Sequence, residues 1–259
     1  MKKFLQKCWR KLRRVTDGNA FVCDCCGVEI FEYPKRRLCF DCEKSLSRIG
    51  ERRCPKCGRE TKAEGVCLDC KAKVQAFTQG FSPFVYRGET ASLVNRMKNG
   101  KFRLALYFGE QMSAYFVKNF SEELPRIATD DEPFLLIPVP ITEGKRAERG
   151  YNQAERLALS IIQDFEKRGI AAETDFTILQ KQRENLAQKQ MSSRERLQNV
   201  QGAYHVHKRK ACRGRRILLI DDILTTGTTS GECAKRLLNA GAREVYLLVA
   251  SAVPEEEDE

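Results

Sequence analysis

The sequence predicts an α/β fold with a parallel sheet flanked by helices, preceded by a small N-terminal module that folds around metal. The sheet is predicted by short, fully apolar runs that recur along the chain and are separated by helical patterns. Phe134 to Ile137, Ile217 to Ile220 and Val245 to Ala250 are runs of this kind. The module is predicted by four Cys-x-x-Cys pairs, which all lie before residue 74.

The cysteine region, residues 21–73, has the spacing of a zinc-ribbon or zinc-finger module. The 259-residue chain carries 12 Cys and no apolar signal region, which favours metal ligation over disulfides. Zn²⁺ prefers four ligands, and a Cys-x-x-Cys turn lets two thiolates reach one metal. Because the region has few large apolar residues, we expect it to need metal to fold. The candidate ligands are Cys23, Cys26, Cys39, Cys42, Cys54, Cys57, Cys67 and Cys70.

These eight cysteines are enough for two tetrahedral sites of four thiolates each. The pairing that we expect first is sequential, with the first four thiols in one site and the last four in the other. A cross-braced pairing and a single occupied site both remain open. Cys25 is an additional thiol beside the first pair, and we expect Cys8, Cys212 and Cys233 to be ordinary thiols.

Positive charge is concentrated at the beginning of the chain. Residues 1–73 hold 19 of the 46 Lys and Arg but only 10 of the 35 Asp and Glu. This is either a solvated basic surface or an electrostatic footprint for polyanions. The turn Cys54-x-x-Cys57 is called the second knuckle here. The cations around it that are suited to phosphate are Arg52, Arg53, Lys56 and Arg59.

The first 20 residues begin with a basic amphipathic pattern over residues 1–15. Three roles are open for such a helix: it binds an anionic membrane, it binds nucleic acid, or it packs on its own protein. Packing on its own protein is expected first, because an apolar stripe on a helix most often faces a core. The sequence contains no run of about 18 apolar residues, so we expect no transmembrane segment. We expect a cytoplasmic protein, with peripheral contact at the inner face of the membrane open through residues 1–15.

The stretch from Arg215 to Thr229 carries the chemistry of the predicted α/β domain, residues 74–254. Two carboxylates, Asp221 and Asp222, follow the apolar strand, and a loop of small hydroxyl residues then opens a helix. Backbone N–H groups, the helix dipole and the hydroxyls favour a phosphate there. Carboxylates repel phosphate, so we expect the aspartates to face sugar hydroxyls or Mg²⁺. A ribose 5-phosphate satisfies both requirements. The candidate phosphate residues are Thr225, Thr226, Gly227, Thr228 and Thr229.

A second cationic loop is predicted after the strand that ends at Ile137. It carries Lys145, Arg146 and Arg149 and opens onto a helix from Gln153 to Arg168. Because the 5-phosphate already has a site, this loop suits a pyrophosphate. The alternative is a solvated basic turn.

A lid and a tail complete the predicted domain. After a further short strand, Phe176 to Leu179, the polar stretch from Lys181 to Gln201 has the length of a functional loop that closes over a ligand. Its candidate cations are Arg183, Arg194 and Arg196. The acidic tail, residues 255–259, is expected to be disordered.

The Asp-Asp-x-x-Thr-Thr-Gly-x-Thr stretch resembles the phosphoribosyl pyrophosphate (PRPP) motif of type I phosphoribosyltransferases. The order of motifs resembles the ComF family of competence proteins: Cys-x-x-Cys pairs, Pro138-Val-Pro, Arg149-Gly-Tyr-Asn-Gln, the basic stretch ending at Ala203, and the PRPP motif. The resemblance implies a type I phosphoribosyltransferase fold that binds PRPP with Mg²⁺. It also implies ribose hydroxyls at Asp221 and Asp222, and pyrophosphate at Arg146 and Arg149.

Two functions of different classes follow from this resemblance. In the first, the protein is a PRPP-binding competence factor that acts on or with incoming single-stranded DNA during natural transformation, together with competence or DNA-uptake proteins. The basic zinc module favours this function, because catalysis on a small molecule does not require one. In the second, it is an active phosphoribosyltransferase, with Asp221 and Asp222 as catalytic residues and release of pyrophosphate. A third interpretation makes the zinc module a protein-docking element.

Overall fold

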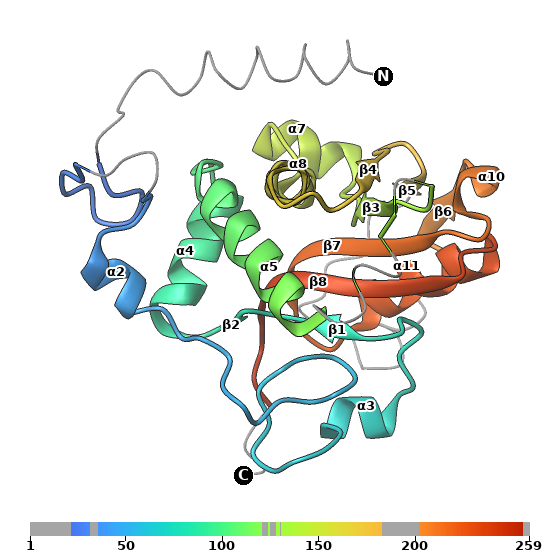
Figure 1. Ribbon diagram of the computed structural model, residues 1–259, viewed down its shortest axis with the longest axis horizontal. Helices are drawn as coiled ribbons and strands as arrows, with labels where there is room; N and C mark the ends of the chain where they lie inside the picture. Colours follow the sequence, from blue (N-terminus) through green and yellow to red (C-terminus); the bar gives the residue numbers. More distant parts are fainter. Residues whose placement is uncertain are drawn as a thin grey trace. The chain divides into compact units, whose positions relative to one another are not determined.

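The computed structural model of the chain describes residues 22–31, 36–120, 124, 128–129, 131–182 and 202–255 (Figure 1). The chain forms two compact units, residues 1–46 and 47–259. We expected the boundary after residue 73, at the end of the cysteine region. The units instead divide within that region, so the second four-cysteine group belongs to the same unit as the sheet.

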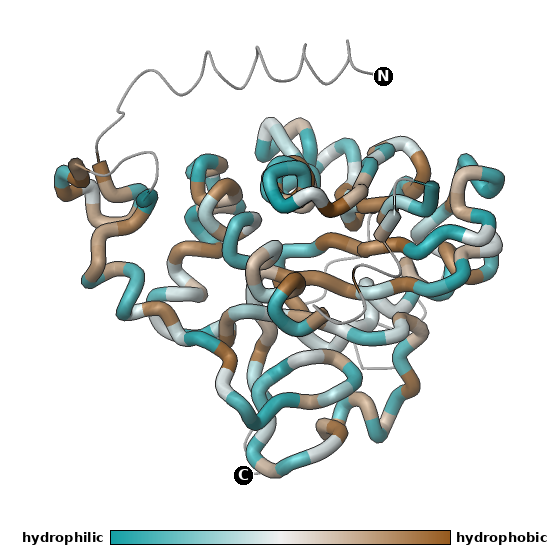
Figure 2. The backbone as a smooth tube through the Cα atoms, in the orientation of Figure 1, coloured by the Kyte–Doolittle hydropathy of each residue, from teal (hydrophilic) through white to brown (hydrophobic). Residues whose placement is uncertain are grey.

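A parallel sheet forms the second unit's framework, in the order β1–β8–β7–β3–β4, with β2 also paired to β8. Buried Leu, Ile and Val dominate β7 and β8, as expected for strands covered on both faces (Figure 2). The predicted parallel sheet is confirmed. The strands are β1 (Gly80–Phe81), β2 (Phe84–Val85), β3 (Phe134–Pro138), β4 (Ala172–Thr174), β7 (Arg216–Leu224) and β8 (Glu244–Ala252).

Helices cover the sheet. On one face α4 (Gly88–Lys98), α5 (Leu104–Phe120) and α8 (Gln153–Lys167) pack on β7 and β8, and α11 (Thr228–Asn239) packs on the other (Figure 1). Within the described part of the chain, every helix is too short or too polar to span a bilayer. The predicted helix over residues 1–15 lies outside the described residues.

The shorter elements lie around this framework. A small antiparallel sheet joins β5 (Leu179–Lys181) to β6 (Tyr204–Val206). The remaining helices are α2 (Phe40–Lys44), α3 (Leu68–Ala72), α7 (Glu143–Arg149) and α10 (Arg209–Cys212).

The strand predicted at Phe176 to Leu179 was largely wrong. Asp175 accepts hydrogen bonds from the backbone and hydroxyl of Thr177 at 2.9 and 2.6 Å, and this local turn replaces the strand. Only Leu179 is in a strand, the first residue of β5. The edge strand β4 escaped prediction because Ala-Glu-Thr is half-buried and has no apolar run.

The strand order reverses between β3 and β7. From β3 the chain passes through α8 to β4 on one side, whereas β7 continues through α11 to β8 on the other. Pro138 pairs with Ile220, and the Val139 N–H donates to the Ile220 carbonyl at 2.8 Å. The carboxyl ends of β3 and β7 therefore lie side by side, where open α/β sheets bind their ligands.

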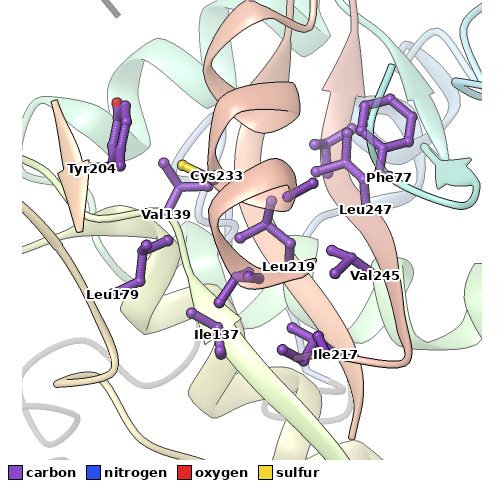
Figure 3. Packing of buried hydrophobic residues seen from close by; sticks show 14 of the residues in the cluster. Phe77, Ile137, Val139, Leu179, Tyr204, Ile217, Leu219, Cys233, Val245 and Leu247 are labelled. Carbon is purple, nitrogen blue, oxygen red and sulfur yellow. The ribbon is translucent and has the colours of Figure 1, made fainter. Parts of the chain in front are cut away.

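The core on the α11 face reaches into the cysteine region. Ile217, Leu219 and Val245 of the sheet belong to the same buried cluster as Cys233 of α11 (Figure 3). The same buried cluster includes Phe77, seen beside Leu247 in Figure 3, and three thiols of the second four-cysteine group. That group is thus part of the core of the α/β unit.

Candidate anion and metal sites

The Thr225–Thr229 loop joins β7 to α11 at the carboxyl edge of the sheet. Gly227 has φ +73°, the left-handed region that favours glycine, and no side chain caps α11 there. The Thr226 and Thr228 hydroxyl oxygens lie 3.0 Å apart. The first N–H groups of α11 and two hydroxyls therefore lie together at one helix end, and such a set of donors has the chemistry of a phosphate site.

The two aspartates lie on opposite faces of β7. We expected the strand to stop at Ile220, but β7 continues to Leu224, and successive side chains in a strand alternate. Asp221 shares the α11 face with Leu219. Burial, and next the charge of Asp221, raise the pKa of the Cys233 thiol well above its usual value.

Asp222 is 4 % exposed, and its Oδ2 lies 3.2 Å from Lys98 Nζ at the end of α4. Among the described residues this oxygen accepts no well-oriented hydrogen bond, so the contact with Lys98 is electrostatic. The oxygen retains acceptor capacity for a hydroxyl. Lys98 was not predicted as a site residue, because its local sequence pattern is that of a solvated lysine.

Burial raises the pKa of Asp221 well above its ordinary range, and the charge of Asp222 acts in the same direction. The Asp222 N–H donates to Asp221 Oδ1 at 2.9 Å and partly opposes this effect. A half-buried carboxylate of this kind is favoured by a cation or by hydroxyl donors, so the donor set fits ribose hydroxyls or Mg²⁺.

The predicted cationic loop after β3 is a helix, so its description as a loop was wrong. Thr142 caps α7 by accepting from the Lys145 N–H at 3.4 Å, and Gly150 ends it with φ +77°. The Glu-Gly-Lys-Arg-Ala-Glu-Arg sequence has no apolar stripe that could have indicated a helix. Arg146 forms an ion pair with Glu155, whereas the Lys145 side chain is exposed. Arg149 donates to Gln153 Oε1 at 3.4 Å.

The Arg149-Gly-Tyr-Asn-Gln stretch joins this region to α4. Tyr151 Oη donates to the Met97 carbonyl and accepts from the Gly100 N–H at 3.3 Å. Asn152 donates to the Val139 carbonyl at 3.0 Å and caps α8. These bonds hold the end of α4 at the carboxyl edge of β3.

The predicted lid cations, Arg183, Arg194 and Arg196, lie outside the described residues. The residues at the two ends of this stretch are described, and there Lys181 of β5 pairs with Tyr204 of β6. Lys181 Nζ also lies 5.3 Å from the centre of the Tyr204 ring. Tyr204 is fully buried in the α11-face core, so one end of the stretch is fixed to the domain.

The cysteines come together in the sequential pairing. Within each set of four, the sulfur atoms lie within 4.8 Å of one another. The distances of 3.7 Å between Cys26 and Cys39 Sγ and 3.6 Å between Cys57 and Cys67 Sγ match the edge of a zinc tetrahedron, about 3.8 Å for Zn–S bonds of about 2.3 Å. Both sets therefore fit Zn²⁺. Cys25 is not among the four. The sets are Cys23, Cys26, Cys39 and Cys42, and Cys54, Cys57, Cys67 and Cys70.

The two four-cysteine groups are built alike. Each begins with a turn closed by a glycine in the left-handed region, Gly27 at φ +78° and Gly58 at φ +77°. Each continues to a cysteine at the N-cap of a short helix, Cys39 before α2 and Cys67 before α3. The chain thus contains an internal repeat, of which the second copy is the more deeply buried.

The thiols of the second group are hydrogen-bonded to one another. Hydrogen bonding with Cys57 lowers the pKa of Cys54, whereas the same contact raises the pKa of Cys57 to about 12. Zn²⁺ binding displaces such protons, so the metal converts this group to thiolates.

Of the basic residues around the second knuckle, Arg59 is buried and Lys56 is half-buried, whereas Arg52 and Arg53 are exposed. Arg53 donates to Tyr115 Oη at 2.7 Å and to Asn119 Oδ1 at 2.6 Å, and Lys56 donates to the Phe77 and Thr78 carbonyls. Arg59 is 5 % exposed. These contacts stabilise the α/β unit. They join residues that are far apart in the chain, so the local sequence pattern does not predict them.

Comparison with known proteins places the chain in a family. The phosphoribosyl transferase domain family matches residues 147–259. Competence protein ComFC of Streptococcus pneumoniae is 30 % identical over 211 residues, which cover 80 % of this chain and 84 % of that protein. The chain belongs to the ComF family. ComFC of Bacillus subtilis is 27 % identical over 214 residues, covering 80 % of each chain. DNA utilization protein YhgH of Escherichia coli K12 is 25 % identical over 213 residues, covering 81 % of this chain and 88 % of that one. The predicted membership in the ComF family is confirmed, as is the phosphoribosyltransferase-like fold class.

Proposed function

We propose that this ComF-family protein binds PRPP at the carboxyl ends of β3 and β7 and acts with single-stranded DNA as a competence factor. The observation that carries the proposal is the Thr225–Thr229 loop at the start of α11, at the strand-order reversal and directly after Asp221 and Asp222. The relatives named for competence and for DNA utilization support the second half of the proposal.

Each part of PRPP has a partner of suitable chemistry. The loop N–H groups and hydroxyls take the 5-phosphate, and the free acceptor of Asp222 takes a ribose hydroxyl. Lys145 and Arg149 are four residues apart on α7, so one face of that helix presents both to a pyrophosphate. The carboxylates of Asp221 and Asp222 would hold Mg²⁺, which would supply positive charge that favours the pyrophosphate. Asp221, whose pKa is raised, is stabilised as a carboxylate by such a cation.

The alternative, an active phosphoribosyltransferase, uses the same binding site and differs in turnover. Electrostatic stabilisation of departing pyrophosphate by Lys145, Arg146 and Arg149 would serve that reaction. Pyrophosphate release in the presence of candidate acceptors distinguishes the two functions.

The first experiment is calorimetric titration of the full chain with PRPP and Mg²⁺, with and without single-stranded DNA. We expect PRPP to bind, Asp221→Asn with Asp222→Asn to abolish binding, and DNA to change the affinity. Glu244→Gln is the matched control, since this carboxylate pairs with Arg216 at the opposite end of the sheet. We expect the DNA affinity itself to fall steeply with salt.

The outcomes separate the hypotheses. PRPP binding that is indifferent to DNA, together with pyrophosphate release, would favour the enzyme. The absence of PRPP binding would overturn the site assignment altogether.

A further inference from the structure

Arg59 connects the second four-cysteine group to the anion-binding loop. One guanidinium nitrogen lies 2.6 Å from Asp69 Oδ2, and the other donates to the Thr225 carbonyl. The Arg59 charge also interacts with the sulfur atoms of Cys57 and Cys67. Four thiolates around one Zn²⁺ carry net negative charge, so the guanidinium is the natural counter-charge of an occupied site.

Gln75, the second connection, is 4 % exposed and follows the last cysteine of the group by five residues. Its Nε2 donates to the Thr226 carbonyl at 3.4 Å. A Cβ atom on Gly227 would lie 3.0 Å from this side chain, so Gln75 packs directly against the loop backbone. Gln75 Oε1 is buried and accepts no hydrogen bond among the described residues.

These contacts fix the direction of two peptide groups. In a planar trans peptide the carbonyl of one residue and the N–H of the next point in opposite directions. With the Thr225 and Thr226 carbonyls directed at Arg59 and Gln75, the N–H groups of Thr226 and Gly227 point to the other side of the loop. Neither N–H group donates to a backbone carbonyl in the described part of the chain. Both are therefore presented for an anion.

The internal repeat shows that this arrangement is particular to the second copy. Each copy has a Cys-x-x-Cys-Gly turn, and the residue after the glycine is Val28 in the first and Arg59 in the second. Val28 is 52 % exposed, whereas Arg59 is 5 % exposed. The turn itself therefore requires no buried cation at this position, and the contact with the loop accounts for the arginine.

We propose that Arg59 and Gln75 are positioning residues that couple the second four-cysteine group to the Thr225–Thr229 loop, so that Zn²⁺ at the cysteines and PRPP at the loop strengthen each other's binding. The inference rests on the proposed PRPP site. Metal-bound cysteines hold Arg59 and α3 in place, and these hold the loop carbonyls away from the anion. Coupling of this kind is reciprocal, so one factor describes both directions.

The test uses the full zinc-loaded chain and follows zinc release to a coloured chelator, with and without PRPP and Mg²⁺. We expect PRPP to slow the release of one zinc equivalent by about tenfold or more, because a hydrogen bond to a charged group is worth about that factor in an equilibrium constant. The other equivalent, from the first group, should be unaffected.

Arg59→Met should weaken PRPP binding by about tenfold and abolish the protection, whereas Arg59→Lys should retain part of both. The matched control is Arg52→Met, because Arg52 lies in the same knuckle and donates only to the Lys62 carbonyl among the bonds described, at 3.2 Å. The release experiment on the unaltered chain needs no variant, so a misfolded Arg59→Met protein does not leave the proposal undecided.

Two results would overturn the coupling while leaving the proposed function intact. One is PRPP binding that protects neither zinc equivalent. The other is an Arg59→Met protein that binds PRPP within about twofold of the unaltered chain. The absence of PRPP binding to the unaltered chain would refute the proposed function and the coupling together.

Discussion

Lys98 at the end of α4 pairs with the buried carboxylate of Asp222 in β7, with Nζ 3.2 Å from Oδ2. The Asp222 carboxylate is 6 % exposed and the Lys98 side chain 22 %, so the pair is largely removed from water. The Tyr151 hydroxyl bonded to Met97 and Gly100 holds the end of α4 in this position. The lysine thus neutralises one carboxylate of the proposed ribose site.

Lys98→Met should destabilise the chain by about 3 kcal/mol, because it leaves a buried carboxylate without its counter-charge. Urea denaturation measures this free energy. Adding Asp222→Asn to Lys98→Met should recover part of the loss, since the uncompensated charge is then gone. Lys101→Met, at an exposed neighbouring lysine, should change stability by less than about 0.5 kcal/mol. Additive losses in the double variant would contradict the pairing.

Asp221→Asn should stabilise the chain near neutral pH. Because the folded-state pKa of Asp221 is raised above the usual 3.8, the folded state binds more protons than the unfolded state between the two values. The contribution of Asp221 to stability is therefore complete below the unfolded pKa and is lost as pH rises through the folded pKa. The amide does not titrate, so the advantage of the variant should be largest at about pH 7 and vanish towards about pH 4.

Asp175→Asn provides a control of opposite sign for that experiment. Burial raises the pKa of Asp175, but hydrogen bonds from Lys208 and Thr177 outweigh burial and lower it overall. This carboxylate contributes stability that is present above its unfolded pKa and lost as pH falls. Denaturation midpoints measured from about pH 2 to 8 should show opposite trends for the two variants, with the change for Asp175→Asn lying below about pH 4. Parallel trends would refute the assignment for Asp221.

Gly227→Ala should weaken PRPP binding, in addition to the loss of stability that a Cβ atom causes at a residue with left-handed φ. A left-handed φ costs a residue with a Cβ atom about 1 to 2 kcal/mol, and at this position the added carbon also meets Gln75 at 3.0 Å. Gly214→Ala is the matched control, with φ +72° and nothing within 4 Å of the added carbon. Both variants should lose stability, but calorimetry should show weaker PRPP binding only for Gly227→Ala. If Gly227→Ala and Gly214→Ala bound PRPP with equal affinity, the phosphate would have to bind outside the Thr225–Thr229 loop.

Chelation of zinc should change hydrogen exchange in two separate places. The first four-cysteine group has an exposed thiol, Cys26, and should release metal first, with loss of protection over the described residues of 22–46. Metal loss from the second group should then increase exchange at Thr225–Thr229, although the sheet remains folded. Exchange measured by mass spectrometry resolves both steps. An unchanged loop after complete metal removal would contradict the shared core.

The sequence by itself determined the fold class and much of the secondary structure. The apolar runs at β3, β7 and β8 predicted the parallel sheet, because strands buried on both faces need continuous apolar side chains. The Cys-x-x-Cys spacing predicted two sets of four ligands, with the sequential pairing expected first, and the stretch from Asp221 to Thr229 predicted a strand that leads through a small-residue loop into a helix. All of these depend on residues close together in the chain.

Only the tertiary structure decided which distant residues meet. The contact of Lys98 with Asp222 joins residues more than 100 positions apart, and the contact of Arg59 with Thr225 joins residues 166 positions apart. Their local patterns are those of ordinary surface cations. The extension of β7 through both aspartates also depends on its partner β8, whose residues up to Ala252 pair with it. Sheet pairing therefore put the carboxylates on opposite faces, and long-range packing made the second cysteine group part of the domain that carries the loop.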